Sequence, residues 1–152
     1  MATNTTPSSN NADEQTAVPF KDTKELLLYL YADLARLSRV ASPDIILHPF
    51  HDRSHPLEGI AAAQAHEEAL IASTGGTLAM DVESVIANAH FGVVMGVLRA
   101  RSGHSSQQDL AVPFCGLWRF DARGRPVEHW ENAAVEPRVM ARWLEAARGD
   151  GC

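Results

Sequence analysis

The chain has 152 residues, of which 45% are hydrophobic and 21% are charged. This length and composition supply apolar surface for one core, and they exclude a wholly disordered chain and a second domain. The formal net charge of −6 disfavours nucleic acid as the main partner, because phosphate binding needs a basic surface of lysine and arginine.

The domain organisation follows from where the apolar residues occur. Residues 1–19 are rich in Thr, Ser and Asn and predict a disordered N-terminal tail, 20–148 form the domain, and 149–152 form a C-terminal tail. No apolar run approaches the roughly 18 residues of a membrane span, and the start has neither a basic nor an apolar segment of a signal peptide. Two cysteines give no disulfide framework, so we expect a cytoplasmic protein without a membrane partner.

The first half of the domain is predicted to be mainly helical. Leucines recur at helical spacing over residues 24–42, as one helix or as two short ones. The brief apolar run 45–49 predicts a strand, and the polar segment 51–58 predicts a loop. The alanine-rich segment 59–73 predicts a second long helix.

The second half is predicted to be a β-meander followed by a helix. Its strands are rich in Val, Ile, Phe and Trp and are separated by turn residues. The predicted strands are 78–87, 91–101, 110–120 and 126–133, and the predicted helix is 138–147. This order predicts an α+β domain in which helices pack on the concave face of a strongly bent, mostly antiparallel sheet.

Four segments resemble the nuclear-transport-factor-2-like superfamily, and within it the SnoaL-like polyketide cyclases and the ketosteroid isomerases. The segments are 42–49 (SPDIILHP), 57–60 (LEGI), 118–125 (WRFDARGR) and 127–131 (VEHWE). The last two together are the most specific, because an aromatic-basic-aromatic strand runs through a glycine turn into an acidic-His-Trp-acidic strand. The resemblance implies a cone-shaped α+β barrel that encloses one pocket.

The last strand carries the first candidate catalytic residues. Side chains alternate along a strand, so His129 and Glu131 share one face. The resemblance implies that this face looks into the cavity, where a carboxylic acid and an imidazole could form an acid–base pair. The alternative is a structural hydrogen bond between the two at the end of the sheet.

His48 is the third candidate catalytic residue. The resemblance places it where ketosteroid isomerases have the carboxylate that moves the proton, and an imidazole can serve as donor or acceptor near neutral pH. The alternative is a histidine that only satisfies a backbone carbonyl. The second acid of those isomerases would fall near Gly116, which has no side chain, so steroid isomerisation by their mechanism is not expected.

Apolar and aromatic residues suggest what the pocket binds. The predicted substrate-binding residues are Tyr31, His66, Phe114 and Trp118. They favour a hydrophobic ligand, and the absence of phosphate-binding and dinucleotide motifs predicts no cofactor. The run His48, His51 and His55 invites a metal interpretation, but the two prolines among them make it irregular, and we predict no metal site.

These expectations combine into one functional hypothesis and one alternative. The hypothesis is a cofactor-independent cyclase, isomerase or dehydratase of secondary metabolism that transfers protons on a small hydrophobic, polyketide-like carbonyl compound. The alternative is a ligand-binding or dimerisation module without turnover. We also expect a homodimer through the outer sheet face, with alternating residues of 91–98, Cys115 and Leu117 at the interface.

Overall fold

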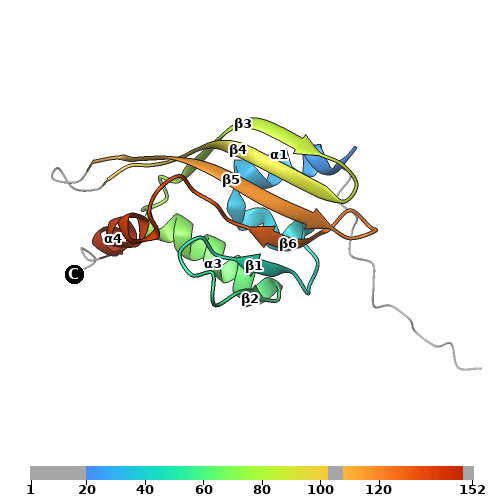
Figure 1. The fold of residues 1–152 in the computed structure, drawn as a ribbon, viewed down its shortest axis with the longest axis horizontal. Coiled ribbons are helices and arrows are strands. Elements are labelled where there is room, and N and C mark those ends of the chain that lie inside the picture. The colour runs from blue at the N-terminus through green and yellow to red at the C-terminus, as the bar shows by residue number, and fades with distance from the viewer. Residues whose placement is uncertain (1–19, 103–107, 149–152) are drawn as a thin grey trace, which may run out of the picture.

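The computed structural model describes residues 20–102 and 108–148, and Figure 1 shows their arrangement. The helices are α1 (Thr23–Ala32), the 3-10 turn η1 (Leu34–Arg36), α2 (Leu37–Val40), α3 (Ile60–Ser73) and α4 (Pro137–Arg148). The strands are β1 (Ile46–His48), β2 (Leu57–Glu58), β3 (Ala79–Ala87), β4 (Phe91–Ala100), β5 (Leu110–Phe120) and β6 (Pro126–Trp130). The predicted tails 1–19 and 149–152 lie outside the described residues.

The six strands form one sheet in the order β2-β1-β6-β5-β4-β3. Only β1 and β6 run parallel, and the other neighbours are antiparallel. The mixed α+β fold and the mostly antiparallel sheet are therefore as predicted. The sheet stays open, with β2 and β3 at its edges, so strand pairing does not close the expected barrel.

Two boundaries differ from the sequence prediction. A loop was expected over 51–58, but β2 forms at its end because Leu57 and Glu58 pair with β1. A strand was expected as far as residue 133, but β6 ends at Trp130. The chain beyond it still follows β5, since the backbone N–H of Cys115 donates to the carbonyl of Asn132 over 2.8 Å.

The first helical segment is divided by aspartates. The side chain of Asp22 accepts a hydrogen bond from the N–H of Glu25 and caps α1. The side chain of Asp33 accepts one from the N–H of Ala35, which starts η1 and separates α1 from α2. The two-helix alternative of the sequence analysis is therefore the one that forms.

The core lies between the helices and one face of the sheet, as Figure 1 shows for α1 and α3. Its most completely buried large side chains include Leu27, Leu30, Leu37, Ile45, Leu47, Val94 and Trp118. Each contributes roughly 1.5–3 kcal/mol by leaving water. Along β4 the alternation is regular, with Val94 and Leu98 facing the core while Phe91 and Met95 are exposed on the outer face.

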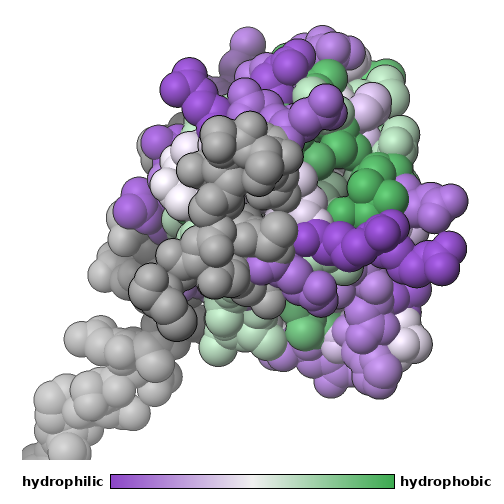
Figure 2. Space-filling view, turned by 90° about the vertical axis from the view of Figure 1, so that its left-hand side faces the viewer, coloured by the Kyte–Doolittle hydropathy of each residue, from purple (hydrophilic) through white to green (hydrophobic). Residues whose placement is uncertain are grey.

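The end of the molecule at α4 has a mixed surface. Figure 2, which views that end, shows hydrophobic surface beside hydrophilic side chains. On α4 the side chains of Met140 and Trp143 are buried, whereas that of Val139 is exposed. Among the described residues, no helix is long and apolar enough to cross a membrane.

Candidate active site

A cavity of about 200 Å³ lies between the sheet and helices α1, α3 and α4. Its apolar lining includes Leu34, Phe50, Leu70, Met80, Leu98, Phe114 and Met140. Its polar lining includes Tyr31, His51, His66, Glu67, His129, Glu131 and Asn132. An apolar cavity of about 150 Å³ can hold benzene, so this one has room for a compact ring-sized ligand.

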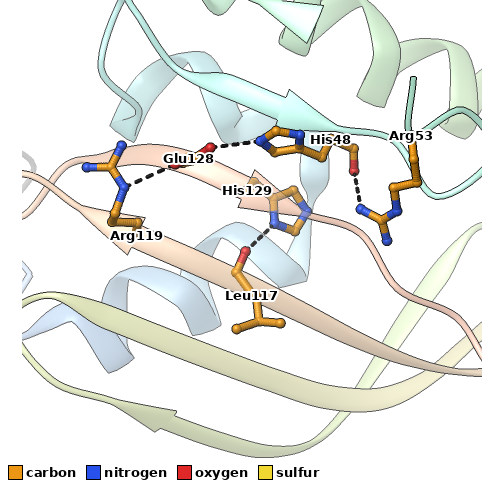
Figure 3. Close-up of polar contacts among 6 residues, drawn as sticks. All are labelled: His48, Arg53, Leu117, Arg119, Glu128 and His129. Atoms are coloured by element: carbon orange, nitrogen blue, oxygen red, sulfur yellow. Dashed lines mark hydrogen bonds and ion pairs between the residues drawn. The ribbon is translucent and has the colours of Figure 1, made fainter. Parts of the chain in front are cut away.

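His129 comes from β6 and is 4% exposed. Its Nδ1 lies 2.9 Å from the carbonyl oxygen of Leu117, as Figure 3 shows, and its ring stacks on Trp118 at 3.6 Å between centroids. Because the carbonyl can only accept, Nδ1 carries the hydrogen and Nε2 keeps a free lone pair. Burial lowers the pKa of His129 to about 4, so the ring is neutral at pH 7.

Glu131 follows β6 and is held by two hydrogen bonds. Its Oε1 lies 2.8 Å from Nε2 of His66 on α3, and its Oε2 accepts from the backbone N–H of Phe50 over 3.1 Å. Burial alone would raise the pKa of Glu131, but the hydrogen bond and charge of His66 outweigh burial and lower it. Glu131 is therefore ionised at neutral pH. In turn burial would lower the pKa of His66, but Glu131 raises it above its ordinary value.

Arg53 fixes the segment that carries Glu131. Its guanidinium donates to the backbone carbonyl of Glu131, to Oδ1 of Asn132 at 2.7 Å and to the carbonyl of His48 at 3.2 Å. Figure 3 shows the contact with His48. These bonds tie the loop after β1 to the end of β6, and the sequence analysis did not identify this role.

Glu67 on α3 is the acidic residue that the sequence analysis missed. It is 2% exposed, and its Oε2 has no hydrogen-bond partner among the described residues. Burial and the nearby charge of Glu131 raise the pKa of Glu67 to about 8. A signal was present, because Glu67 follows Ala63 by four residues and precedes Leu70 by three, on the inward stripe of the helix.

Tyr31 brings a hydroxyl to the same cavity from α1. Its oxygen accepts a hydrogen bond from Nε1 of Trp118 over 3.0 Å, and its ring stacks on Phe114 with centroids 5.6 Å apart. Burial raises the pKa of Tyr31 above its ordinary value, so the hydroxyl keeps its hydrogen and can donate it. Gly116 provides the space, because a Cβ there would overlap the hydroxyl oxygen.

One group of residues has the spacing to hold a metal ion. In the described part of the chain, Glu67, His129 and Glu131 each offer one ligand atom, and these atoms lie within 4.8 Å of one another. Without a cation between them, the carboxyl groups of Glu67 and Glu131 are too close for both to be ionised easily, because their charges repel. In the histidine run of the sequence, His48 bonds Glu128 and His55 bonds Asp52.

His48 is not brought to the cavity. The register pairs Leu47 with His129 and His48 with Trp130, so His48 lies on the other face of the sheet from His129. Its Nε2 is 2.8 Å from Glu128, which also accepts from Arg119 over 3.1 Å, and Figure 3 shows this chain of contacts. His48 was expected as the third catalytic residue, but its side chain bonds Glu128 and does not line the cavity.

The other predicted residues lie in or beside the cavity. Tyr31, His66 and Phe114 line it with His129 and Glu131. Trp118 lies one layer further from the cavity, where it donates to Tyr31 and stacks on His129. It supports the site without lining it.

Comparison with solved structures identifies the fold. A protein of unknown function with a cystatin-like fold from Xanthomonas campestris is 21% identical, over 80% of this chain and 98% of that one, with a TM-score of 0.65. A protein from Jannaschia sp. CCS1 provisionally named a SnoaL-like polyketide cyclase is 20% identical, over 82% and 92%, with a TM-score of 0.64. A steroid delta-isomerase from Pseudomonas aeruginosa is 18% identical, over 88% and 96%, with a TM-score of 0.57.

The chain therefore has the nuclear-transport-factor-2-like fold, which is shared by proteins named as cyclases, isomerases and proteins of unknown function. At identities of 18% to 21%, the similarity to these proteins shows a shared fold and not a shared activity. No protein-family model matches the sequence, and no curated protein matches it either.

Proposed function

We propose that the chain is an enzyme that transfers protons on a small hydrophobic carbonyl compound without a cofactor, in a cyclisation, isomerisation or dehydration. The observation that carries the proposal is that the ionised carboxylate of Glu131 and the neutral imidazole of His129 face one apolar cavity. A carboxylate base beside an apolar wall suits proton abstraction next to a carbonyl, and the neutral imidazole adds a hydrogen-bond acceptor.

Each polar group has a role in this proposal. Glu131 is the base, because each carboxylate oxygen keeps a lone pair beyond the bonds to His66 and Phe50. The Tyr31 hydroxyl donates a hydrogen bond to the oxygen on which negative charge develops. Nε2 of His129 accepts a hydrogen bond from a hydroxyl of the ligand.

A specific observation favours the alternative of a binding module without turnover. Both oxygens of Glu131 already accept hydrogen bonds inside the protein, one from His66 and one from the backbone of Phe50. A carboxylate so engaged is a weaker base than a free one, because its partners stabilise the charged form. In that case the cavity binds a ligand and the His–Glu contact is structural.

Deuterium exchange separates the two candidates without knowledge of the natural substrate. The protein is incubated in D₂O with a panel of one- and two-ring ketones, and exchange at the carbon next to the carbonyl is followed by proton NMR. The enzyme should accelerate exchange of at least one ketone, and Glu131→Gln should not. Ketones that bind but exchange at the buffer rate would instead support the module.

We also propose a homodimer through the outer sheet face. Ile86, Phe91, Met95 and Leu117 are more than one-third exposed there, and the strand register places Ile86, Val93 and Leu117 in one row across β3, β4 and β5. Because an exposed apolar row is unfavourable in water, it favours a dimer in which a second copy of the chain buries it. The exposed ion pair of Arg99 and Asp81, further along β4 and β3, offers both signs of charge, which a two-fold partner can match.

A further inference from the structure

We propose that Glu67 is a catalytic acid of this pocket, which carries a proton and delivers it to the carbonyl oxygen of the ligand. This inference rests on the proposed function of the same pocket. It adds Glu67 from α3 to His129 and Glu131, which come from β6 and the residue after it. It also specifies the ligand, which must bring a ketone or aldehyde oxygen to the part of the cavity that Glu67 lines.

The position of Glu67 is the first argument. The residue is 2% exposed and lines the cavity, yet its Oε2 has no hydrogen-bond partner among the described residues. A buried ionised oxygen without a partner is very unfavourable, whereas a protonated carboxyl needs only an acceptor. Because Oε2 has almost no accessible surface, the hydrogen would lie on Oε1, where a carbonyl oxygen in the cavity would accept it.

The groups around Glu67 give the second argument. A carboxylate oxygen of Glu131 lies within 4.8 Å of one of Glu67, and like charges so close do not both ionise. His66 neutralises Glu131 through a direct hydrogen bond. His129 is neutral and Tyr31 keeps its hydrogen, so neither offsets a second negative charge. Glu67 therefore holds the proton, in line with a pKa raised to about 8.

The two carboxyl groups then complete a balanced step. Glu131 removes a proton from the carbon next to the carbonyl, and the electron pair of that C–H bond forms the C=C bond of an enol. The π pair of the carbonyl takes the proton from Glu67, so Glu131 becomes neutral as Glu67 becomes ionised. The pair carries one negative charge before and after the step, which avoids a change of charge in a buried site. Glu131 then gives its proton to another carbon while the enol O–H returns its proton to Glu67, which re-forms the C=O bond and completes an isomerisation.

Infrared spectroscopy of the whole chain tests the protonation state directly. At pH 6.5 the wild type should show the C=O stretch of a protonated carboxylic acid, which should disappear by pH 10. Glu67→Gln should lack this band. The matched control is Glu68→Gln, because Glu68 is the exposed neighbour on the same helix. A wild type without the band, or a band that persists in Glu67→Gln, overturns the proposal.

Ligand binding tests the oxygen contact. 1-Tetralone and tetralin differ essentially in one carbonyl, and both are two-ring compounds. The wild type should bind 1-tetralone at least roughly fivefold more tightly than tetralin, as expected for one hydrogen bond, and Glu67→Leu should reduce that preference, although the Tyr31 hydroxyl remains. Equal affinities in the wild type, or a preference unchanged in Glu67→Leu, overturn the proposal, as does binding of neither compound.

The results also separate this inference from the proposed function. If the protein exchanges deuterium but shows no protonated Glu67, the proposed function stands and the role of Glu67 is wrong. If Glu67 is protonated and binds the ketone but no exchange occurs, the proposed function is wrong. Metal found by elemental analysis on the purified wild type and lost in Glu67→Gln would overturn the acid role, because a metal ligand is ionised.

Discussion

The hydroxyl oxygen of Tyr31 occupies the space that a side chain at Gly116 would fill. The strand position that lacks an acid is therefore filled by a donor from α1, which Trp118 holds in place through a hydrogen bond of 3.0 Å.

Gly116→Ala should destabilise the protein by about 1–3 kcal/mol, because the added Cβ overlaps the Tyr31 hydroxyl and lies 3.3 Å from Cε1 of His129. Tyr31→Phe should cost about 1–3 kcal/mol, because the N–H of Trp118 loses its acceptor. The double variant should cost less than the sum, since removing the oxygen removes the overlap. Urea denaturation measures all three, and additive costs would show that the two residues do not compete for the space.

Glu131→Gln should reduce deuterium exchange or turnover by about a hundredfold or more, the usual scale of general acid–base catalysis. The amide keeps the shape but does not accept the substrate proton. His48→Ala is the matched control, because His48 bonds Glu128 on the opposite face of the sheet. It should leave kcat within twofold and cost about 1 kcal/mol of stability. Equal losses of activity in the two variants would contradict the placement of the site.

The difference between His48 and His129 shows what the sequence could predict. Alternation along one strand placed His129 and Glu131 on one face, and both line the cavity. The sheet face on which the His48 side chain lies depends on how β1 pairs with β6. These two strands are about 80 residues apart in the chain. The spacing of residues along one strand does not reveal that register, so the sequence did not show that the His48 side chain faces away from the cavity.

Glu67 was missed for a different reason. Apolar residues identify the buried stripe of a helix, and a charged residue on that stripe is usually treated as a break in the pattern. Here the buried stripe of α3 contacts both the core and the cavity, and Glu67 lines the cavity. A glutamate at core spacing between Ala63 and Leu70 is the type of exception that functional sites produce.

The stability of the protein should depend on pH through Glu67. Its pKa rises from 4.5 to about 8 on folding, so between these values the unfolded chain releases a proton that the folded chain retains. The stabilising contribution is complete below pH 4.5 and is lost as pH rises towards 8, by at most about 1.4 kcal/mol per pH unit. The free energy of unfolding of the wild type minus that of Glu67→Gln should fall over this range. A flat difference between pH 5 and 8 would contradict the raised pKa.

His129 should remain neutral well below the ordinary pKa of histidine. Burial lowers its pKa from 6.5 to about 4, and the bond to Leu117 fixes the Nδ1–H tautomer. Nitrogen-15 NMR of the imidazole should therefore show a neutral ring with a protonated Nδ1 at pH 5.5. Because the unfolded chain takes up a proton first, this group's contribution to stability is lost as pH falls from 6.5 to 4. A doubly protonated ring at pH 5.5 would show that the site is open to water.

Leu117→Glu should convert the proposed homodimer into a monomer. Leu117 is 38% exposed at the β5 end of the apolar row, with Val93 beside it on β4 and Trp130 on its other side on β6. A carboxylate buried there against its symmetry copy would lack a partner and repel its equivalent. Leu28→Glu is the matched control, because Leu28 is 44% exposed but lies on α1, away from the outer sheet face. Sedimentation at micromolar concentration should give a dimer for the wild type and for Leu28→Glu, and a folded monomer for Leu117→Glu. A monomeric wild type would show that the row is solvent-exposed, and a dimeric Leu117→Glu would place the interface on another surface.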